Sequence, residues 1–186
     1  MILKFKQWYP RIKKSAWVAP SADVIGDVKI GKDSSIWFGT VIRGDVHKIR
    51  IGKRTSVQDL SMIHISHYKK PDRSDGNPTI IGDDVTIGHK VMLHGCTIEN
   101  GCLIGMSATI LDGAVIGEGS IVGAHSLVTS NKVFPPHSLI MGSPAKVVKT
   151  LTQDEVDGLI AHAKRYVNFK NEYHYDTLAK KVKKKK

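Results

Sequence analysis

The sequence of 186 residues is poor in cysteine and has no long apolar run. Its two cysteines, Cys96 and Cys102, are too few for a disulfide framework, and we assign them no chemistry. No stretch approaches the roughly 18 consecutive apolar residues of a membrane-spanning helix. The N-terminal segment MILKFKQWYPRIKK lacks the apolar centre of a signal peptide. We therefore expect a cytoplasmic protein with reduced thiols and no membrane partner.

Aromatic residues are also scarce, at 6% of the chain, and the positive charge is unevenly distributed. The net charge is +11, but six of the lysines lie in the terminal segment KKVKKKK. We expect residues 180–186 to form a solvated Lys-rich tail. Because so few aromatic side chains are available for base stacking, the charge does not predict a nucleic-acid partner.

Aliphatic residues recur every six positions through most of the chain. A period of six residues fits neither the helical repeat of about 3.6 residues nor the alternation of a strand, and it is typical of a hexapeptide solenoid. We therefore predict a mainly β protein whose residues 1–150 form a parallel β-helix. Three hexads make one triangular coil, and successive coils stack about 4.8 Å apart. The repeat positions are Val18, Val24, Ile30, Ile36, Ile42, Ile51, Val57, Ile63, Ile81, Ile87, Leu93, Ile98, Ile104, Ile110, Ile116, Val122, Val128, Phe134 and Ile140.

Two segments depart from this repeat. Residues 66–78 combine proline, glycine and charged residues, which predicts a loop that projects from the solenoid. Residues Thr152–Glu155 have the sequence of a helix capping box, and apolar residues follow at helical spacing. We expect a helix over about residues 153–178, in a segment, 151–179, that packs against the solenoid.

Three histidines lie within the repeat. Once the loop is set aside, Ile63 and Leu93 belong to the same side of the triangular prism, one coil apart. His64 and His94 follow them directly, so both should face outward and could bind one metal ion. His89 lies on a different edge and can reach that site only from a neighbouring subunit. This arrangement predicts a homotrimer with identical metal sites at its interfaces.

Further polar residues occur near these histidines. Arg43 lies one coil below His64 on the same side, and Asp45 follows two residues later. Gln58 and Asp59 lie on the preceding side. We interpret Arg43 and Asp59 mainly as partners in ion pairs between subunits, Arg43 with Asp45 or Asp59. Gln58 has both a donor and an acceptor, and it could orient a metal-bound water or bicarbonate.

The motifs VIRGDV, SVQDLSMIH and IGHKVMLHGC occur in this order on a hexapeptide solenoid. The chain from about Val18 to Lys146, and on into the C-terminal helix, resembles the γ-class carbonic anhydrases and their homologues. The resemblance implies a left-handed β-helical homotrimer with zinc (or iron or cobalt) held between subunits. The metal ligands it implies are His64, His89 and His94, and the other site residues are Arg43, Asp45, Gln58, Asp59 and Tyr166. Helix packing is an alternative role for Tyr166.

The implied activity is the reversible hydration of CO2 to bicarbonate by a metal-bound hydroxide. Three neutral nitrogen ligands leave Zn²⁺ its double charge, which lowers the pKa of bound water to about 7. The sequence departs from the best-studied type of this family. Val46 stands where that type has a glutamate, and the 66–78 loop has no glutamate. His67 in that loop is a candidate proton shuttle.

Other functions share the same solenoid. Hexapeptide acyltransferases use acetyl-CoA or acyl carrier protein, and the segment GSPAK at 142–146 occurs in both groups. An acyl-CoA thioesterase could use the same metal-bound nucleophile on another carbonyl. A non-catalytic metal-binding trimer is a further alternative. The three histidines favour the metal site over a CoA-dependent transferase.

Overall fold

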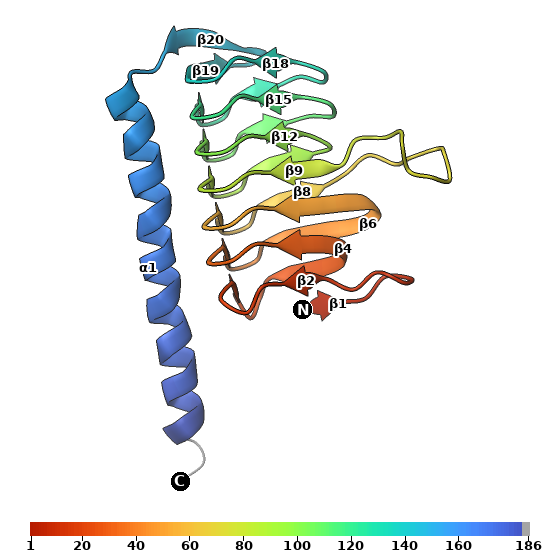
Figure 1. The fold of residues 1–186 in the computed structure, drawn as a ribbon, viewed down its shortest axis with the longest axis vertical. Helices are drawn as coiled ribbons and strands as arrows, with labels where there is room; N and C mark the ends of the chain where they lie inside the picture. The colour runs from red at the N-terminus through yellow and green to blue at the C-terminus, as the bar shows by residue number, and fades with distance from the viewer. Residues whose placement is uncertain (184–186) are drawn as a thin grey trace.

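The computed structural model describes residues 1–183, with side chains up to Tyr173, and consists of a parallel β-solenoid followed by one long helix (Figure 1). The solenoid has three faces, here called side one, side two and side three. Side one contains β8 (Met62–His64), β11 (Met92–His94), β14 (Thr109–Ile110) and β17 (Leu127–Val128). Side two contains β2 (Arg11–Ile12), β9 (Thr79–Ile81), β12 (Thr97–Ile98), β15 (Val115–Ile116) and β18 (Val133–Phe134).

Side three contains β3 (Trp17–Val18), β5 (Ser35–Ile36), β7 (Ser56–Val57), β10 (Thr86–Ile87), β13 (Leu103–Ile104), β16 (Ile121–Val122) and β19 (Ser138–Gly142). Two longer strands, β4 (Asp23–Ile30) and β6 (Val41–Ile51), turn the corner from side one to side two. At the N-terminal end β1 (Ile2–Leu3) pairs with β4, and at the other end β20 (Ala145–Thr150) pairs antiparallel with β19.

The core is a stack of the six-residue repeat positions. Ile63 pairs in register with Ile42 below it and with Leu93 above it, so each position covers the same position of the next coil. All repeat positions except the half-buried Val18 are buried. The predicted hexapeptide solenoid is therefore confirmed. The three-residue delay between Ile42 and Ile51 is taken up by β6, which continues around a corner as one strand.

The corners between side three and side one have a left-handed backbone. Leu60, Lys90 and Ser107 have φ angles of 59°, 57° and 60°. Backbone hydrogen bonds stack these corners, with Lys90 N–H donating to the Asp59 carbonyl and Ser107 N–H to the His89 carbonyl, both at 2.9 Å. Asp59 and His89 are thereby held one above the other at the same edge of the prism.

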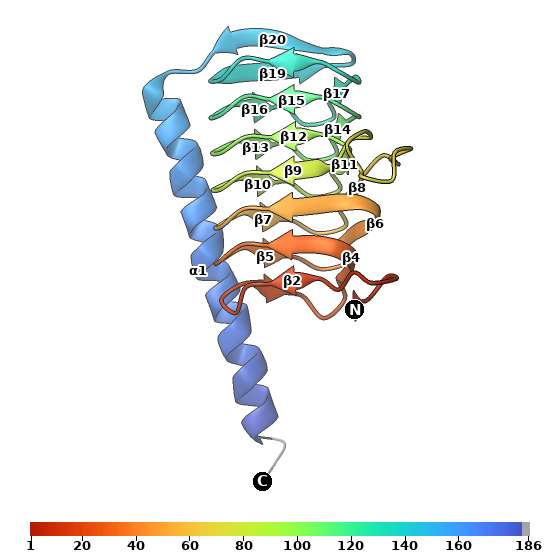
Figure 2. The same ribbon diagram turned by 45° about the vertical axis from the view of Figure 1, so that its right-hand side comes forward.

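The helix α1 (Gln153–Lys183) covers side three and contacts β5, β7 and β10 (Figure 2). The predicted capping box is present, because Glu155 accepts a hydrogen bond from Thr152 N–H at 2.9 Å and its own N–H donates to Thr152 Oγ1. The helix runs beyond its predicted end and includes the first part of the expected Lys-rich tail. The rest of that tail, 184–186, lies outside the described residues. Within the described chain, no helix combines the length and apolar character needed to span a membrane.

Between β8 and β9 the chain forms the loop predicted at 66–78, which extends away from the solenoid (Figure 1). Arg73, near the middle of this loop, contacts the N-terminal part of the chain. Its guanidinium group lies over the rings of Trp8 and Tyr68, at 5.1 and 5.4 Å from their centroids. The same group forms an ion pair with the buried Asp27 at 3.1 Å. The loop is therefore anchored to the N-terminal coils.

Candidate metal centre

His64 and His94 lie in register at the ends of β8 and β11 on side one. Their ring centroids are 5.2 Å apart, and His64 Nδ1 lies 3.3 Å from His94 Nε2. The structure places the two imidazoles on the same face of adjacent coils because Ile63 and Leu93, the residues before them, are both buried in the core.

Each imidazole turns its other nitrogen to a carboxylate. His64 Nε2 lies 3.0 Å from Asp45 Oδ1, and His94 Nδ1 lies 2.7 Å from Asp112 Oδ1. An ionised carboxylate can only accept a hydrogen bond, so the nitrogen that faces it must carry the hydrogen of the neutral ring. This assigns the hydrogens to Nε2 of His64 and to Nδ1 of His94. The two nitrogens that face each other then both present lone pairs. Burial lowers the pKa of His64, which disfavours an additional proton between them.

This pair of lone pairs fits two ligand positions of a divalent cation. Two nitrogens bound tetrahedrally to Zn²⁺ at about 2.0–2.1 Å would be about 3.3 Å apart, and the observed separation is 3.3 Å. Within the described residues of one chain, no group of three or more His, Cys, Asp or Glu side chains is arranged to hold a metal ion. One chain therefore provides two imidazoles at this position, which is fewer than the three protein ligands of a typical catalytic zinc site.

Arg43 and Asp45 lie on β6 beside this pair. Arg43 forms an ion pair with Asp45 inside one chain, whereas the sequence interpretation placed that pair across a subunit boundary. Although burial raises the pKa of Asp45, hydrogen bonds from His64 and Arg43 hold it below its ordinary value. Asp45 is therefore ionised and can accept the His64 hydrogen.

His89 lies on the edge between side three and side one, on a different face from His64. Its side chain is 47% exposed, and Nδ1 lies 2.8 Å from Asp59 Oδ2. Asp59 is thus a partner of His89 within the same chain, rather than of Arg43. The other ring nitrogen of His89 is left for a ligand outside this contact.

Gln58 and Tyr166 lie beside His89. The Gln58 side chain is 4% exposed and is within hydrogen-bonding reach of the Tyr166 hydroxyl. All three residues line a hollow of about 220 Å³ between α1 and side three. Burial raises the pKa of Tyr166, so its hydroxyl stays protonated at neutral pH. Tyr166 also packs edge-on against Trp37, which is a packing contact of the kind expected for a helix residue.

Two residues of this region were missed in the sequence. Asp112 lies two residues after Ile110, the repeat position that pairs in register with Leu93. Counting coils would have placed Leu111, and not Asp112, above His94, so the repeat gave no signal for this carboxylate. His162 on α1 lines the same hollow as His89, and its Nδ1 lies 3.2 Å from Thr86 Oγ1. No repeat signal marks His162, since it belongs to the helix. The proposed shuttle His67 stacks on Tyr68 in the loop.

Replacing Asp112 with alanine is expected to weaken metal binding by about 10–100-fold, because the carboxylate fixes the orientation of His94. A competitive chelator titration measures this affinity. The matched control is Asp154→Ala, which removes an exposed carboxylate from the first turn of α1. Equal metal affinities in both variants would show that Asp112 does not orient the ligand.

Comparisons with known proteins point to one family. The family model described as "Bacterial transferase hexapeptide (six repeats)" matches residues 78–110 and 95–130. A protein named "Probable carbonic anhydrase" from Methanocaldococcus jannaschii is 49% identical over 156 residues, covering 84% of this chain and 93% of that protein. "Gamma carbonic anhydrase 2, mitochondrial" from Arabidopsis thaliana is 45% identical over 159 residues, covering 86% of this chain and 56% of that protein. A crystal structure of a putative acetyltransferase from Bacillus cereus superposes with a TM-score of 0.86 at 44% identity, covering 92% of this chain and 95% of that one.

Proposed function

Because this chain belongs to the γ-class carbonic anhydrase-like family of hexapeptide-repeat proteins, we propose that it holds a divalent metal ion between subunits and catalyses the reversible hydration of CO2 to bicarbonate. The observation that carries the proposal is the facing pair of nitrogens on His64 and His94. Their separation of 3.3 Å suits two ligands of one cation, and each ring is oriented by a carboxylate.

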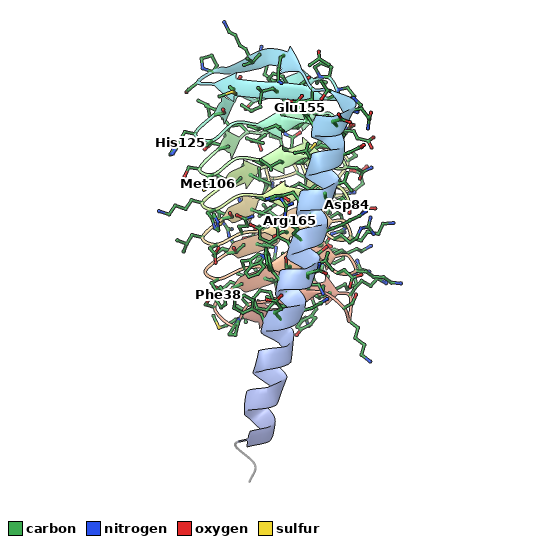
Figure 3. The ribbon with its side chains drawn as sticks, turned by 90° about the vertical axis from the view of Figure 1, so that its left-hand side faces the viewer. Phe38, Asp84, Met106, His125, Glu155 and Arg165 are labelled. Atoms are coloured by element: carbon green, nitrogen blue, oxygen red, sulfur yellow. The ribbon has the colours of Figure 1, made fainter. Side chains whose placement is uncertain are left out.

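The third ligand in this proposal is His89 of a neighbouring copy. A closed three-fold ring brings the edge of one copy that carries His89 to side one of the next and generates three identical sites. Exposed apolar side chains near this edge and on side one support an interface there. They are Phe38, Leu60, Met92 and Met106. Figure 3 shows Phe38 and Met106 along one edge of the solenoid, beside the helix.

His64, His89 and His94 would hold the ion, which we propose to be Zn²⁺, with Fe²⁺ or Co²⁺ as alternatives that also accept imidazole. When bound, such a cation supplies the Lewis acidity that makes water nucleophilic at neutral pH. The low pKa of Asp45 keeps this carboxylate ionised, so it holds the hydrogen of His64 on the nitrogen away from the ion.

Gln58 and Tyr166 reach the site together with His89, because all three line one hollow. The buried Gln58 amide has a donor and an acceptor, and the Tyr166 hydroxyl restricts its orientation. We assign to Gln58 the positioning of the reacting oxygen or of bicarbonate. Arg43, fixed by Asp45, provides a positive charge for the anionic product.

An acyl-transfer reaction is the second candidate, because a solved relative at 44% identity is described as a putative acetyltransferase. The hollow beside His89 includes Leu103 and Met106, whose apolar side chains could pack against an acyl chain. A thioesterase would use the same hollow, and a metal-binding trimer without turnover would use neither substrate.

A paired assay on the metal-loaded protein tests the proposal. We expect stopped-flow measurements to detect CO2 hydration that is lost with a chelator and restored by Zn²⁺, and we expect no thiol release from acetyl-CoA. Each chain contributes three histidines and a trimer has three sites, so metal analysis should give about one ion per chain. Thiol release without CO2 hydration would replace the proposal with the acyl-transfer candidate. Failure of the purified protein to take up any metal would remove the site.

A further inference from the structure

A groove of about 850 Å³ lies on side two at the N-terminal end of the solenoid. Four passes of the chain line it, at residues 10–13, 29–31, 50–52 and 81–83. The strands β2, β4, β6 and β9 that carry these passes stack one above the other in Figure 1. The histidine pair lies on side one and α1 covers side three, so this groove is separate from the candidate metal centre.

Positive side chains are stacked along the groove. Arg11 pairs in register with Lys29, and Lys29 pairs with Arg50, so three cations occupy one position of consecutive coils. Adjacent coils are about 4.8 Å apart, and like charges directly opposite each other on neighbouring strands destabilise a sheet. The same position on the higher coils is neutral, with Ile80, Thr97, Val115 and Val133. This stack of three cations is therefore confined to the coils that line the groove.

These charges are only partly neutralised inside the protein. Arg50 forms an ion pair with Asp27 at 2.8 Å, and Asp83, which lines the groove, forms one with Lys53. Among the described side chains, Arg11, Lys13 and Lys29 are exposed and take part in no ion pair. Lys13 also lines a neighbouring hollow with Lys14 and Lys32, which extends the positive surface. The groove therefore has an excess of cations facing open space.

The shape of the groove limits what can bind there. Its lining combines these charged side chains with isoleucines and glycines of successive coils. The coils pack closely at the glycines, because a Cβ atom on Gly52 would lie 2.4 Å from the Gly82 carbonyl oxygen. A volume of about 850 Å³ is within the range of about 300–1,000 Å³ of small-molecule sites. In the part of the chain that the structure describes, no aromatic residue lines the groove, so it has no platform for stacking a base. Two coil steps spread the charges over about 10 Å.

We propose that this groove binds an oligophosphate group, that is, two or more linked phosphates of a small molecule. Arg11 can bind phosphate oxygens with two parallel N–H groups. Lys29 adds a point charge on the neighbouring coil, and Lys13 adds one two residues after Arg11. The binding does not depend on the metal site and is therefore independent of the function proposed above.

Isothermal titration calorimetry of the full chain with inorganic tripolyphosphate tests this site. We expect saturable binding at one site per chain. The double variant Arg11→Gln/Lys29→Gln should weaken it by about tenfold or more. The matched control Lys132→Gln/Lys146→Gln removes the same charge from exposed positions at the C-terminal end, and should change the affinity by less than about twofold. Both double variants retain the histidines, so any heat from metal chelation by tripolyphosphate is common to them.

Three outcomes would overturn the proposal. Binding that never saturates would indicate that no site exists. Equal weakening in both double variants would indicate attraction to the net charge of the whole molecule. Single-stranded RNA that binds through Arg11 and Lys29 and is not displaced by tripolyphosphate would assign the groove to a macromolecular polyanion instead.

Discussion

Replacing His94 with alanine is expected to abolish metal binding without unfolding the chain. The imidazole provides one of the two facing nitrogens, and its loss leaves His64 without the second ligand of the same chain. We expect the metal content to fall to a small fraction of one ion per chain, and CO2 hydration to fall by at least about 100-fold. The solenoid should persist, because the neighbouring Leu93, and not His94, is buried in the core.

Elemental analysis, circular dichroism and light scattering of the same His94→Ala sample separate these effects. The matched control is His137→Asn, a half-buried histidine at the corner between β18 and β19, away from the proposed subunit interface. His137 has a φ of 56°, and asparagine is among the residues that tolerate this left-handed backbone. Loss of folding or of trimers in His94→Ala would mean that the contact among His64, His94 and Asp112 is structural. Retained metal would mean that the ion binds elsewhere.

Replacing Asp27 with alanine is expected to lower the free energy of unfolding by about 3–5 kcal/mol. Asp27 is 5% exposed and forms ion pairs with Arg50 at 2.8 Å and with Arg73 at 3.1 Å. Both guanidinium groups are mostly buried, and Arg73 is enclosed by Trp8 and Tyr68. Removing the carboxylate leaves two confined cations without their counter-ion, and it releases the 66–78 loop from the N-terminal coils.

Urea unfolding of the Asp27→Ala variant measures this loss. Asp72→Ala removes an exposed carboxylate from the same loop and should stay within about 0.5 kcal/mol of the original protein. The double variant Asp27→Ala/Arg73→Ala should be less destabilised than the sum of its two single variants, because the two residues interact directly. An unchanged unfolding midpoint for Asp27→Ala would mean that the ion pairs contribute no net stability.

Counting along the six-residue repeat was enough to predict the fold and the register of the histidines. The count placed Ile42, Ile63 and Leu93 on one side, and these residues pair with one another in the structure. The capping box at Thr152 likewise marked the start of α1. The repeat could be interpreted in this way because one aliphatic residue in every six must be buried. This requirement fixes which residues of each coil face the core and which face outward.

The partners of the polar residues were not readable in this way. The sequence interpretation joined Arg43 to Asp45 or Asp59 across subunits, whereas Arg43 pairs with Asp45 within the chain and Asp59 lies beside His89. Asp112, the carboxylate beside His94, was missed altogether. The repeat assigns a side chain to a face, but its rotamer is chosen by neighbours that come from other coils.

The sequence by itself determined that this chain is a hexapeptide solenoid with His94 above His64 on an outer face, since the period of buried residues dictates both. Only the tertiary structure decided which nitrogens face each other and where the stack of Arg11, Lys29 and Arg50 leaves charge uncompensated. It also decided that Arg73 reaches back to Asp27. These contacts depend on side-chain orientation and on a loop that folds back over distant coils, and neither follows from the spacing of residues along the chain.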